Sequence, residues 1–353
     1  STALNFAGAN SSMINNTLSS TFAPSGSNGR AIYATGASLL AFNNTATAPS
    51  WVVIFTGASS TIANNTVTAM LSSCINPTSG ATDAIVENNT LLGTGGVYLD
   101  DSPHRAIIRN NIINTTGTGI NVVGGSNVSI DCQGKSIVGT NTSSTYGIYS
   151  TQFNTTIRNC NISNFQHGIF LSSATNGLVE NTNISTSWAA SSSLPRGNGI
   201  YVSGGGNHTI SNVIANTTGI GQGIFLASTT IGSNMTNIVA FGKGTNGRGL
   251  YLSSSGYNTI NNATVYSGTS NSLGITGVSS NNNINGITIS SVAESAIYID
   301  GGPNTSIDCQ GKTIIGTNTS GAYGIYSSQF NTTIRNCNIS NFSTAIGFIG
   351  ATN

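Results

Sequence analysis

The stretch that decides the fold is Gly147-Ile148-Tyr149 followed by Ile157-Arg158-Asn159-Cys160-Asn161-Ile162, and it recurs as Gly324-Ile325-Tyr326 followed by Ile334-Arg335-Asn336-Cys337-Asn338-Ile339. Looser copies fill the rest of the chain at a spacing of 22 to 31 residues. Each copy holds two short β-prone runs separated by Gly, Ser, Asn and Thr, and no run has the spacing of a helix. A period of this length indicates a repeat protein built from stacked coils.

The period also predicts the architecture. A coil of about 22 to 25 residues has room for roughly three short strands and three turns. Stacking such coils pairs each strand with its equivalents above and below, which gives three parallel sheets around one core. Because successive side chains of a strand alternate, Ile148 should point into the core and Tyr149 outward. We expect an all-β solenoid of about 14 coils and roughly 65 Å in length, at ~4.8 Å per coil.

The residue after the core position of the first run is often aromatic. In a stacked array these side chains should form an outward stripe. Its members are Tyr98, Tyr149, Phe170, Tyr201, Phe225, Tyr251, Tyr298 and Tyr326. In the copy after Leu250 we place the core position at Ile275. The stripe reflects either β-propensity and mutual stacking, or a lateral contact or ligand platform.

With this phrase and period, the sequence resembles the right-handed parallel β-helix repeat family, the pectate-lyase-like group, over nearly the whole chain. It is closest in character to archaeal and bacterial cell-surface β-helix repeat proteins. The resemblance implies a right-handed solenoid. It implies no single function, because the family includes lyases, hydrolases, binding modules and inert stalks.

The unbroken repeat indicates one elongated domain over residues 1–353, with a less regular part at 1–80. Residues 127–165 and 304–342 differ at only six of 39 positions and stand 177 residues apart, which indicates duplication of a block of coils. The longest coil contains a loop at 185–197, which is either a binding site or a tolerated insertion.

The composition limits the possible partners. Only 5% of the residues are charged and the formal net charge is +1, which excludes an electropositive track for nucleic acid and a polybasic membrane patch. No apolar run reaches the roughly 18 residues of a membrane span. A long chain with so little ionic surface needs another source of solubility, and covalent glycans would supply it. We therefore expect a secreted protein, extracellular or on the cell surface.

Asn-x-Ser/Thr tripeptides are frequent, although a chain rich in Asn, Ser and Thr also makes them by chance. The candidate glycosylation sites are Asn10, Asn15, Asn43, Asn64, Asn88, Asn114, Asn127, Asn141, Asn154, Asn161, Asn183, Asn207, Asn216, Asn234, Asn262, Asn304, Asn318, Asn331, Asn338 and Asn341.

Cysteine spacing points to two disulfides. Cys132 and Cys160 are 28 residues apart, as are Cys309 and Cys337, and each separation is close to one coil. Residues stacked on adjacent coils lie about 4.8 Å apart at Cα, which suits a disulfide. The alternative is a reduced thiol in an inward position that other coils fill with Asn, such as Asn111.

The densest charged group is Asp100-Asp101-Ser102-Pro103-His104-Arg105, with Asp131 about one coil on. At Asp100 and Asp101 it resembles the polygalacturonases, which implies carboxylates acting on a sugar bond. The Asn-x-Asp, Gly-His-Gly and Arg-Ile-Lys signatures of that family are absent. A turn with a capping Asp and an Asp–Arg pair explains the group without catalysis. We expect no enzyme; otherwise the residues to mutate are Asp100, Asp101, His104 and Arg105.

Metal and cofactor binding are not expected, because three His and five Cys show no ligand spacing. Cys74 has no partner one coil away and should be a buried free thiol.

Two functions from different classes remain. The first is a structural cell-surface protein that assembles with copies of itself end to end into a filament or surface layer, with lateral bundling along the stripe. The recognisable strands at residues 3–6 and 345–348 occupy the same position in a coil and leave strand edges to pair, unless the chain belongs to a longer array. The alternative is a carbohydrate-binding or polysaccharide-degrading β-helix, which would gather acids and aromatics on one sheet. The evenly polar composition favours the structural protein.

Overall fold

The computed structural model describes residues 2–20, 29–188, 197–291 and 294–351. Within these ranges every regular element is a β-strand and there is no helix. The strands form about 14 turns of a parallel solenoid, which confirms the predicted fold. The chain divides into two compact units, the N-terminal unit Ser1–Phe165 and the C-terminal unit Gln166–Asn353.

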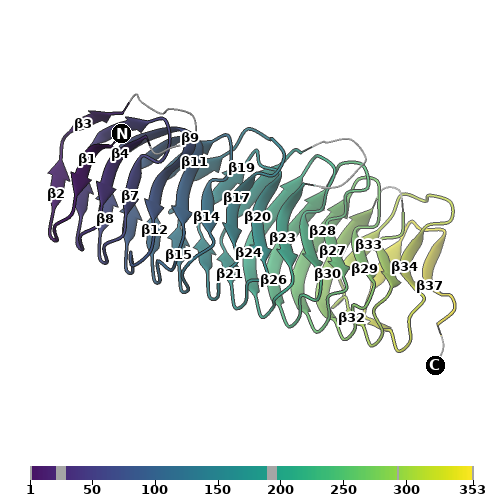
Figure 1. The fold of residues 1–353 in the computed structure, drawn as a ribbon. Helices are drawn as coiled ribbons and strands as arrows, with labels where there is room; N and C mark the ends of the chain where they lie inside the picture. The colour runs from purple at the N-terminus through teal and green to yellow at the C-terminus, as the bar shows by residue number, and fades with distance from the viewer. Residues whose placement is uncertain (1, 21–28, 189–196, 292–293, 352–353) are drawn as a thin grey trace. The chain divides into compact units, whose positions relative to one another are not determined.

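Three parallel ladders run through the N-terminal unit (Figure 1). The first contains β1 (Thr2–Phe6), β4 (Arg30–Ala34), β7 (Val53–Phe55), the last residues of β9 (Thr66–Pro77) and β11 (Thr90–Leu99), β14 (Ile120–Val122) and β17 (Tyr146–Ser150). The second contains β2 (Ser12–Ile14), β5 (Leu40–Phe42), β8 (Thr61–Ala63), β10 (Ile85–Glu87), β12 (Ile107–Arg109), β15 (Ser129–Asp131) and β18 (Thr156–Arg158). The third contains β3 (Thr17–Ser19), β6 (Thr45–Ala48), the first residues of β9 and β11, β13 (Ile112–Thr115), β16 (Ser136–Val138) and β19 (Asn161–Ser163).

The C-terminal unit has the same three ladders. The first contains β20 (His167–Ser172), β23 (Asn198–Ser203), β25 (Ile224–Ala227), β27 (Leu250–Ser253), β29 (Leu273–Thr276), β31 (Ile297–Asp300), β34 (Tyr323–Ser327) and β37 (Thr344–Phe348). The second contains β21 (Leu178–Glu180), the first residues of β24 (Thr209–Thr217), β26 (Asn234–Gly242), β28 (Thr259–Ser267) and β30 (Asn283–Ser291), then β32 (Ser306–Asp308) and β35 (Thr333–Arg335). The third contains β22 (Asn183–Thr186), the last residues of β24, β26, β28 and β30, then β33 (Thr313–Ile315) and β36 (Asn338–Ser340).

Long strands of the C-terminal unit pass from the second ladder to the third without a break. At the bend, Asn212, Asn237 and Asn262 have φ angles of 53°, 54° and 53°. Asn tolerates this left-handed conformation better than most residues. The Asn237 amide donates to Asn212 Oδ1 at 3.0 Å and the Asn262 amide to Asn237 Oδ1 at 2.7 Å, so each bend stabilises the next.

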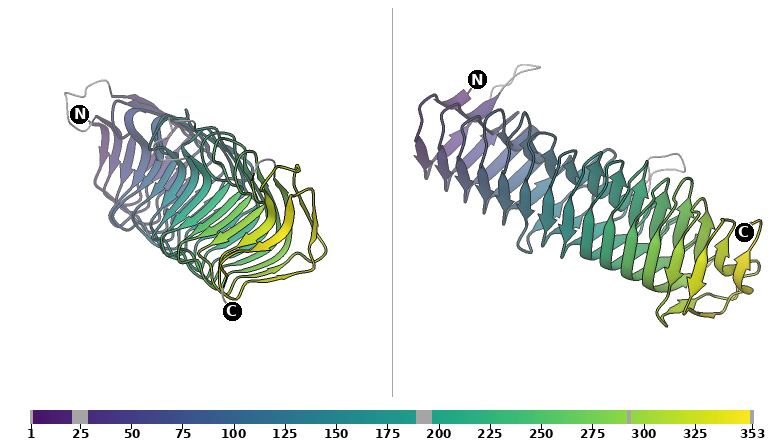
Figure 2. Two further views of the ribbon diagram at one scale, coloured as in Figure 1. Left: turned by 90° about the vertical axis from the view of Figure 1, so that its right-hand side faces the viewer. Right: turned by 90° about the horizontal axis from the view of Figure 1, so that it is seen from below.

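The alternation along the first ladder matches the sequence pattern. Ile148 and Ser150 are fully buried, whereas Tyr149 between them is half-exposed. Strands such as β17 therefore turn alternate side chains toward the interior. Figure 2 shows how the strands of each unit surround this interior.

Aliphatic stacks fill this interior. In the second ladder Ile62, Val86, Ile108, Ile130 and Ile157 lie in register on successive coils, and none is more than 2% exposed. Burial of one such side chain stabilises the fold by roughly 1.5–3 kcal/mol. The period of the sequence is thus the period of the core.

A ladder of buried asparagines runs beside these stacks in the N-terminal unit. Asn44, Asn65, Asn89 and Asn111 are at most 4% exposed. The backbone N–H of Asn44, Asn65 and Asn89 each donates to Oδ1 of the next Asn at 2.8–2.9 Å. These bonds satisfy backbone groups in turns where no strand partner exists.

Both predicted disulfides form. Cys132 is bonded to Cys160 and Cys309 to Cys337, and in each pair the Cα atoms are 4.8 Å apart. Cys160 stands two residues after β18, as Asn111 stands two residues after β12, and Cys132 stands one residue after β15 on the coil between them. The first disulfide therefore joins the two coils that follow the end of the Asn ladder. Cys74 is a buried free cysteine, as expected, and burial raises the pKa of its thiol to about 12.

The predicted register is wrong at Ile275. Strand β29 pairs Leu250 with Leu273 and Leu252 with Ile275, so Leu273 takes the core position assigned to Ile275. Residues two apart in a strand face the same side, and Ile275 is therefore fully buried as well. The outward position of this coil belongs to Gly274.

The described strands of the irregular part at residues 1–80 are regular, but some of their core residues are small. Val53 takes the core position of its coil, in register with Ile32 and Ile75. In the second ladder the core position of β5 is Ala41, which is fully buried. Alanine gives a weak hydrophobic signal, so the pattern of this coil was blurred in the sequence.

Replacing Asn89 by Ala should destabilise the N-terminal unit strongly. The substitution leaves the buried N–H of Asn65 and the carbonyl of Ile62 without their 2.9 and 2.8 Å partners, and one buried unpaired group costs about 1–3 kcal/mol. Asn88→Gly is the matched control, because Asn88 is exposed and has a φ of 56° that glycine adopts freely. Chemical denaturation should show a far larger loss for Asn89→Ala; equal losses would contradict the ladder's role.

Candidate functional site

One face of the first ladder in the C-terminal unit carries a column of aromatic rings. Phe170, Tyr201, Phe225 and Tyr251 occupy the same position on β20, β23, β25 and β27. Neighbouring ring centroids are 4.6, 5.1 and 4.9 Å apart, with interplanar angles of 10°, 10° and 13°. All four side chains are half-exposed. The structure thus places half of the predicted stripe in one continuous column.

The column is interrupted on the next coil. Gly274 pairs with Tyr251 on one side and with Tyr298 on the other, and it has no ring. The stack resumes at Tyr298 and Tyr326, whose centroids are 5.0 Å apart at an interplanar angle of 7°. The gap is therefore one coil wide.

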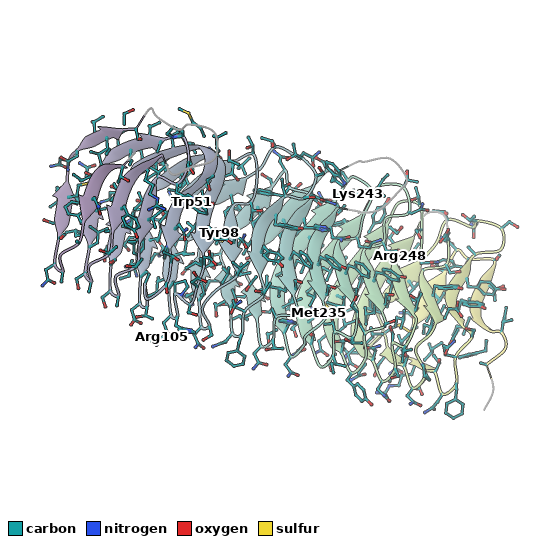
Figure 3. The ribbon with its side chains drawn as sticks, in the orientation of Figure 1. Trp51, Tyr98, Arg105, Met235, Lys243 and Arg248 are labelled. Atoms are coloured by element: carbon teal, nitrogen blue, oxygen red, sulfur yellow. A yellow bond between two sulfur atoms is a disulfide. The ribbon has the colours of Figure 1, made fainter. Side chains whose placement is uncertain are left out.

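The side chain of Arg248 lies at this gap (Figure 3). Its guanidinium carbon is 4.3 Å from the centroid of the Tyr251 ring, a cation–π contact. A Cβ atom at Gly274 would come within 3.0 Å of both Cδ and Nε of Arg248. The absence of a side chain at Gly274 therefore allows Arg248 to lie against this coil.

Beside Arg248 the surface opens into a pocket of about 480 Å³. Most of its wall comes from the segments that lead into β27, β29, β31 and β34 of the first ladder. The lining residues are Arg248, Asn271, Glu294, Ser295, Tyr298, Ser320, Gly321 and Ala322. The wall combines an aromatic ring with amide, hydroxyl, carboxylate and guanidinium groups, which is the composition of a site for a polar ligand.

Hydrogen bonds hold most of the polar groups around the pocket. Asn271 Nδ2 donates to the Ser295 carbonyl at 3.0 Å, and the Ser270 hydroxyl donates to Glu294 Oε2 at 3.2 Å. Asn271 and Ser295 are buried at the base, whereas Glu294 is exposed. Fixed polar groups such as Asn271, together with the accessible carboxylate of Glu294, can recognise hydroxyl groups of a ligand.

Tyr298 forms the aromatic part of the wall. Its hydroxyl donates to Asp300 Oδ2 at 3.2 Å, and the Ser328 hydroxyl donates to Asp300 Oδ1 at 2.8 Å. Burial and then the negative charge of Asp300 raise the pKa of Tyr298, and the positive charge of Arg248 opposes that rise. The phenol therefore stays protonated at neutral pH.

In the three coils before Arg248, buried polar side chains fill the position two residues before the core residue of the first ladder. His167, Asn198 and Gln222 occupy it. The backbone N–H of Gln222 donates to Asn198 Oδ1 at 2.9 Å, and that of Asn198 to His167 Nδ1 at 3.3 Å. Burial lowers the pKa of His167 to about 4, so this histidine is neutral. Sequence analysis missed Arg248, although a cation in a position that holds neutral groups in the three preceding coils of this unit was a usable signal.

In the N-terminal unit the predicted stripe is not continuous. Tyr98 and Tyr149 are separated by Asn121, which lies in register with both. Tyr98 instead packs against Trp51, with ring centroids 5.4 Å apart (Figure 3). The two rings of the stripe in this unit therefore make separate surfaces.

The acid-rich turn at residues 100–105 makes contacts with different coils. Arg105 donates two hydrogen bonds of 2.7 Å to the carboxylate of Asp83, on the preceding coil. His104 accepts the backbone N–H of Ser126, on the following coil, at Nδ1 with a distance of 3.0 Å. Arg105 and His104 thus have separate structural partners. That the turn is not catalytic, and that its residues are the ones to mutate if the protein is an enzyme, stays a prediction.

Asp131 lies in another array of charges, in strand β15. It accepts hydrogen bonds from Arg158 Nε at 3.0 Å, Asn159 Nδ2 at 2.9 Å and the Gln133 N–H at 3.1 Å. Burial raises the pKa of Asp131, but these hydrogen bonds and the charge of Arg158 outweigh it and hold the pKa below its ordinary value. Asp131 is therefore a structural partner of β18. In the described part of the chain no three His, Cys, Asp or Glu residues lie close enough to hold a metal ion.

The sequon asparagines lie at the surface. All are exposed except Asn141 and Asn216, which are half-buried. Their glycosylation stays a prediction.

Most of the loop at 185–197 lies outside the described residues. Near it, the structure shows that the Trp188 carbonyl accepts the Ile220 N–H at 2.9 Å. None of the described segments is a helix long and apolar enough to cross a membrane.

The sequence profile of a protein family described as "Right handed beta helix region" matches residues 2–144 and 146–285. The chain belongs to this family. The handedness that the resemblance implied is thereby confirmed. A search of curated proteins finds no match to this right-handed β-helix.

Solved structures with the same fold include two of different function. A double mutant of the periplasmic alginate epimerase AlgG gives a TM-score of 0.55 at 10% sequence identity, over 85% of this chain and 78% of that chain. The Dettilon tailspike protein gives a TM-score of 0.51 at 14% identity, over 88% of this chain and 62% of that chain. At such identities the likeness shows a shared fold alone.

Replacing Asp131 by Asn should weaken the dependence of stability on acid. A carboxyl whose pKa is lower in the folded than in the unfolded protein stabilises the fold above its unfolded pKa of about 3.9 and loses this effect as the pH falls through the folded value. Wild-type stability should therefore drop below about pH 4, and that of Asp131→Asn should drop less. Urea midpoints from pH 2.5 to 6 measure this, with the exposed Asp101→Asn as control.

Proposed function

We propose that the protein binds carbohydrate on the outer face of the first ladder in the C-terminal unit. The observation that carries the proposal is the pocket of about 480 Å³ beside the aromatic column. Such a pocket offers the two kinds of contact that a sugar needs, an apolar ring for its C–H groups and polar side chains for its hydroxyls.

The column and the pocket contribute differently. The stacked rings cover each other's faces, so the column presents ring edges and phenol groups, among them the Tyr251 hydroxyl, which is 2.8 Å from Thr276 Oγ1. The pocket adds Tyr298 and the polar groups of Asn271 and Glu294. A sugar chain lying along the first ladder would contact the column and place one unit in the pocket.

The comparisons agree with this proposal in fold. AlgG is by its name an epimerase of alginate, a polysaccharide, so this fold is able to provide a protein surface that binds a sugar chain. Neither comparison supports the filament or surface layer that the composition favoured, which stays a prediction. Carbohydrate binding is therefore the better-supported of the two functions.

Secretion is part of the proposal. The two disulfides favour an oxidising compartment, because the cytosol keeps most thiols reduced. Polysaccharides outside the cell would be accessible to a protein in that location.

A bulky side chain at Ser320 tests the pocket. Ser320 is exposed at its wall, so Ser320→Trp should block the site without disturbing the core. The affinity of the best-binding member of an oligosaccharide panel, measured by isothermal titration calorimetry, should fall at least about tenfold, or ~1.4 kcal/mol.

The duplicated block supplies the matched control. Ser143 stands 177 residues before Ser320 in the corresponding turn and is also exposed, so Ser143→Trp should leave binding unchanged. If no oligosaccharide in the panel binds the wild type, or if both variants behave alike, the proposed site is wrong.

A further inference from the structure

Arg248 lacks the kind of ion pair that the structure shows for four other arginines. Arg105, Arg109, Arg158 and Arg335 each contact a carboxylate one coil away, at 2.5 to 3.0 Å. Within the described residues Arg248 makes no ion pair and no side-chain hydrogen bond, and its Nε is buried without a partner. A guanidinium has five N–H donors, so a substantial binding capacity is unused at this point.

We propose that Arg248 is an anion-recognition group, and that the pocket is a subsite for a sugar unit that carries a negatively charged oxygen group, a carboxylate or a sulfate. This inference rests on the proposed carbohydrate binding and specifies the class of ligand. The planar guanidinium forms two parallel hydrogen bonds with such groups, which a neutral hydroxyl does not reproduce.

The position of Arg248 is fixed before a ligand arrives. Its guanidinium lies over the Tyr251 ring, and its Cδ and Nε lie against Gly274. An arginine held in this way loses little side-chain freedom on binding, so more of the interaction energy appears as affinity. The aromatic neighbour also keeps the charge partly away from water, which strengthens its attraction to an anion.

The acids near the pocket do not neutralise Arg248. Glu294 accepts the Ser270 hydroxyl, and Asp300 accepts hydrogen bonds from Tyr298 and Ser328. Neither is within ion-pair distance of Arg248. Glu294 lines the same pocket and would repel a second negative group, so a ligand should direct its charged group toward Arg248 and its hydroxyls toward Glu294.

Gly274 is the second determinant of this subsite. The other coils of the column carry a ring at this position, and a ring here would occupy the space of the Arg248 side chain. Replacing Gly274 by Tyr should therefore continue the column and remove the preference for charged sugars, while the ring edges remain available to neutral ones.

The test compares three oligosaccharides of equal length, a uronic acid oligomer, a sulfated neutral-sugar oligomer and an uncharged oligomer, by isothermal titration calorimetry. The wild type should bind at least one charged oligomer at least about tenfold more tightly than the uncharged one, and this preference should weaken as salt is raised. Whichever charged oligomer is preferred identifies the group as carboxylate or sulfate.

Three variants separate the charge of Arg248 from its packing. Arg248→Gln should lose the preference and its salt dependence while its affinity for the uncharged oligomer stays within about twofold; Arg248→Lys should keep part of the preference, since the charge remains. Lys243→Gln is the matched control, because Lys243 lies 4.8 Å over the Phe241 ring but outside the pocket lining, and it should behave as the wild type.

The outcomes distinguish this inference from the proposed function. If the wild type and Arg248→Gln each bind all three oligomers with the same affinity, the anion subsite is wrong, while the proposed carbohydrate binding remains. A wild type that binds none of the three, nor any member of the wider panel, would overturn both. Circular dichroism melting of each variant confirms that a changed affinity does not come from unfolding.

Discussion

The described strands of each unit pair with their counterparts one coil away, and the rest of the structure depends on that register. Parallel pairing fixes the separation, which is 4.8 Å at Cα for both cysteine pairs. With the distance fixed, a position is stable when the stacked side chains are compatible: aliphatic on aliphatic, amide on amide, base on acid, thiol on thiol. Stacks of these four kinds account for the core, the Asn ladder, the ion pairs and the disulfides.

The same register explains how a few charged residues stabilise the stack of coils, and why the pocket lies where it does. Ion pairs such as Arg158–Asp131 and Arg335–Asp308 join adjacent coils, so each charge reinforces the stack instead of forming a charged surface. The pocket arises where a stack is broken. Gly274 removes one ring from the aromatic column, and Arg248 enters the space with a charge that forms no ion pair within the described residues.

Much of the fold followed from the sequence because the repeat states the register many times. Ile148 and Tyr149 gave the inward and outward faces, and the spacing of Cys132 and Cys160 gave a covalent contact. The register failed at Ile275 because Gly274-Ile275 imitates the Gly-Ile phrase, although the pairing partner of Leu250 is Leu273. A local pattern cannot distinguish positions two residues apart, since both face the core.

The candidate site was less predictable for a related reason. Arg248, Asn271 and Glu294 come from three successive coils and carry no shared motif, so only their stacking brings them to one pocket. Conversely, His104 and Arg105 are neighbours in sequence but have partners on opposite sides, Ser126 and Asp83. Proximity along a coil is a poor guide to proximity in a solenoid, where the nearest neighbours are one period away.

The disulfides have a mechanical consequence. Under tension a stack of coils unwinds from its ends, and each released coil lengthens the chain. A disulfide between adjacent coils carries the force in place of the 28-residue segment that it encloses. The segment therefore cannot be extended, and the stretched chain is shorter by roughly 90–100 Å. The duplicated block places one such bond in each unit, so pulling on either unit would meet a covalent limit before the whole chain was drawn out.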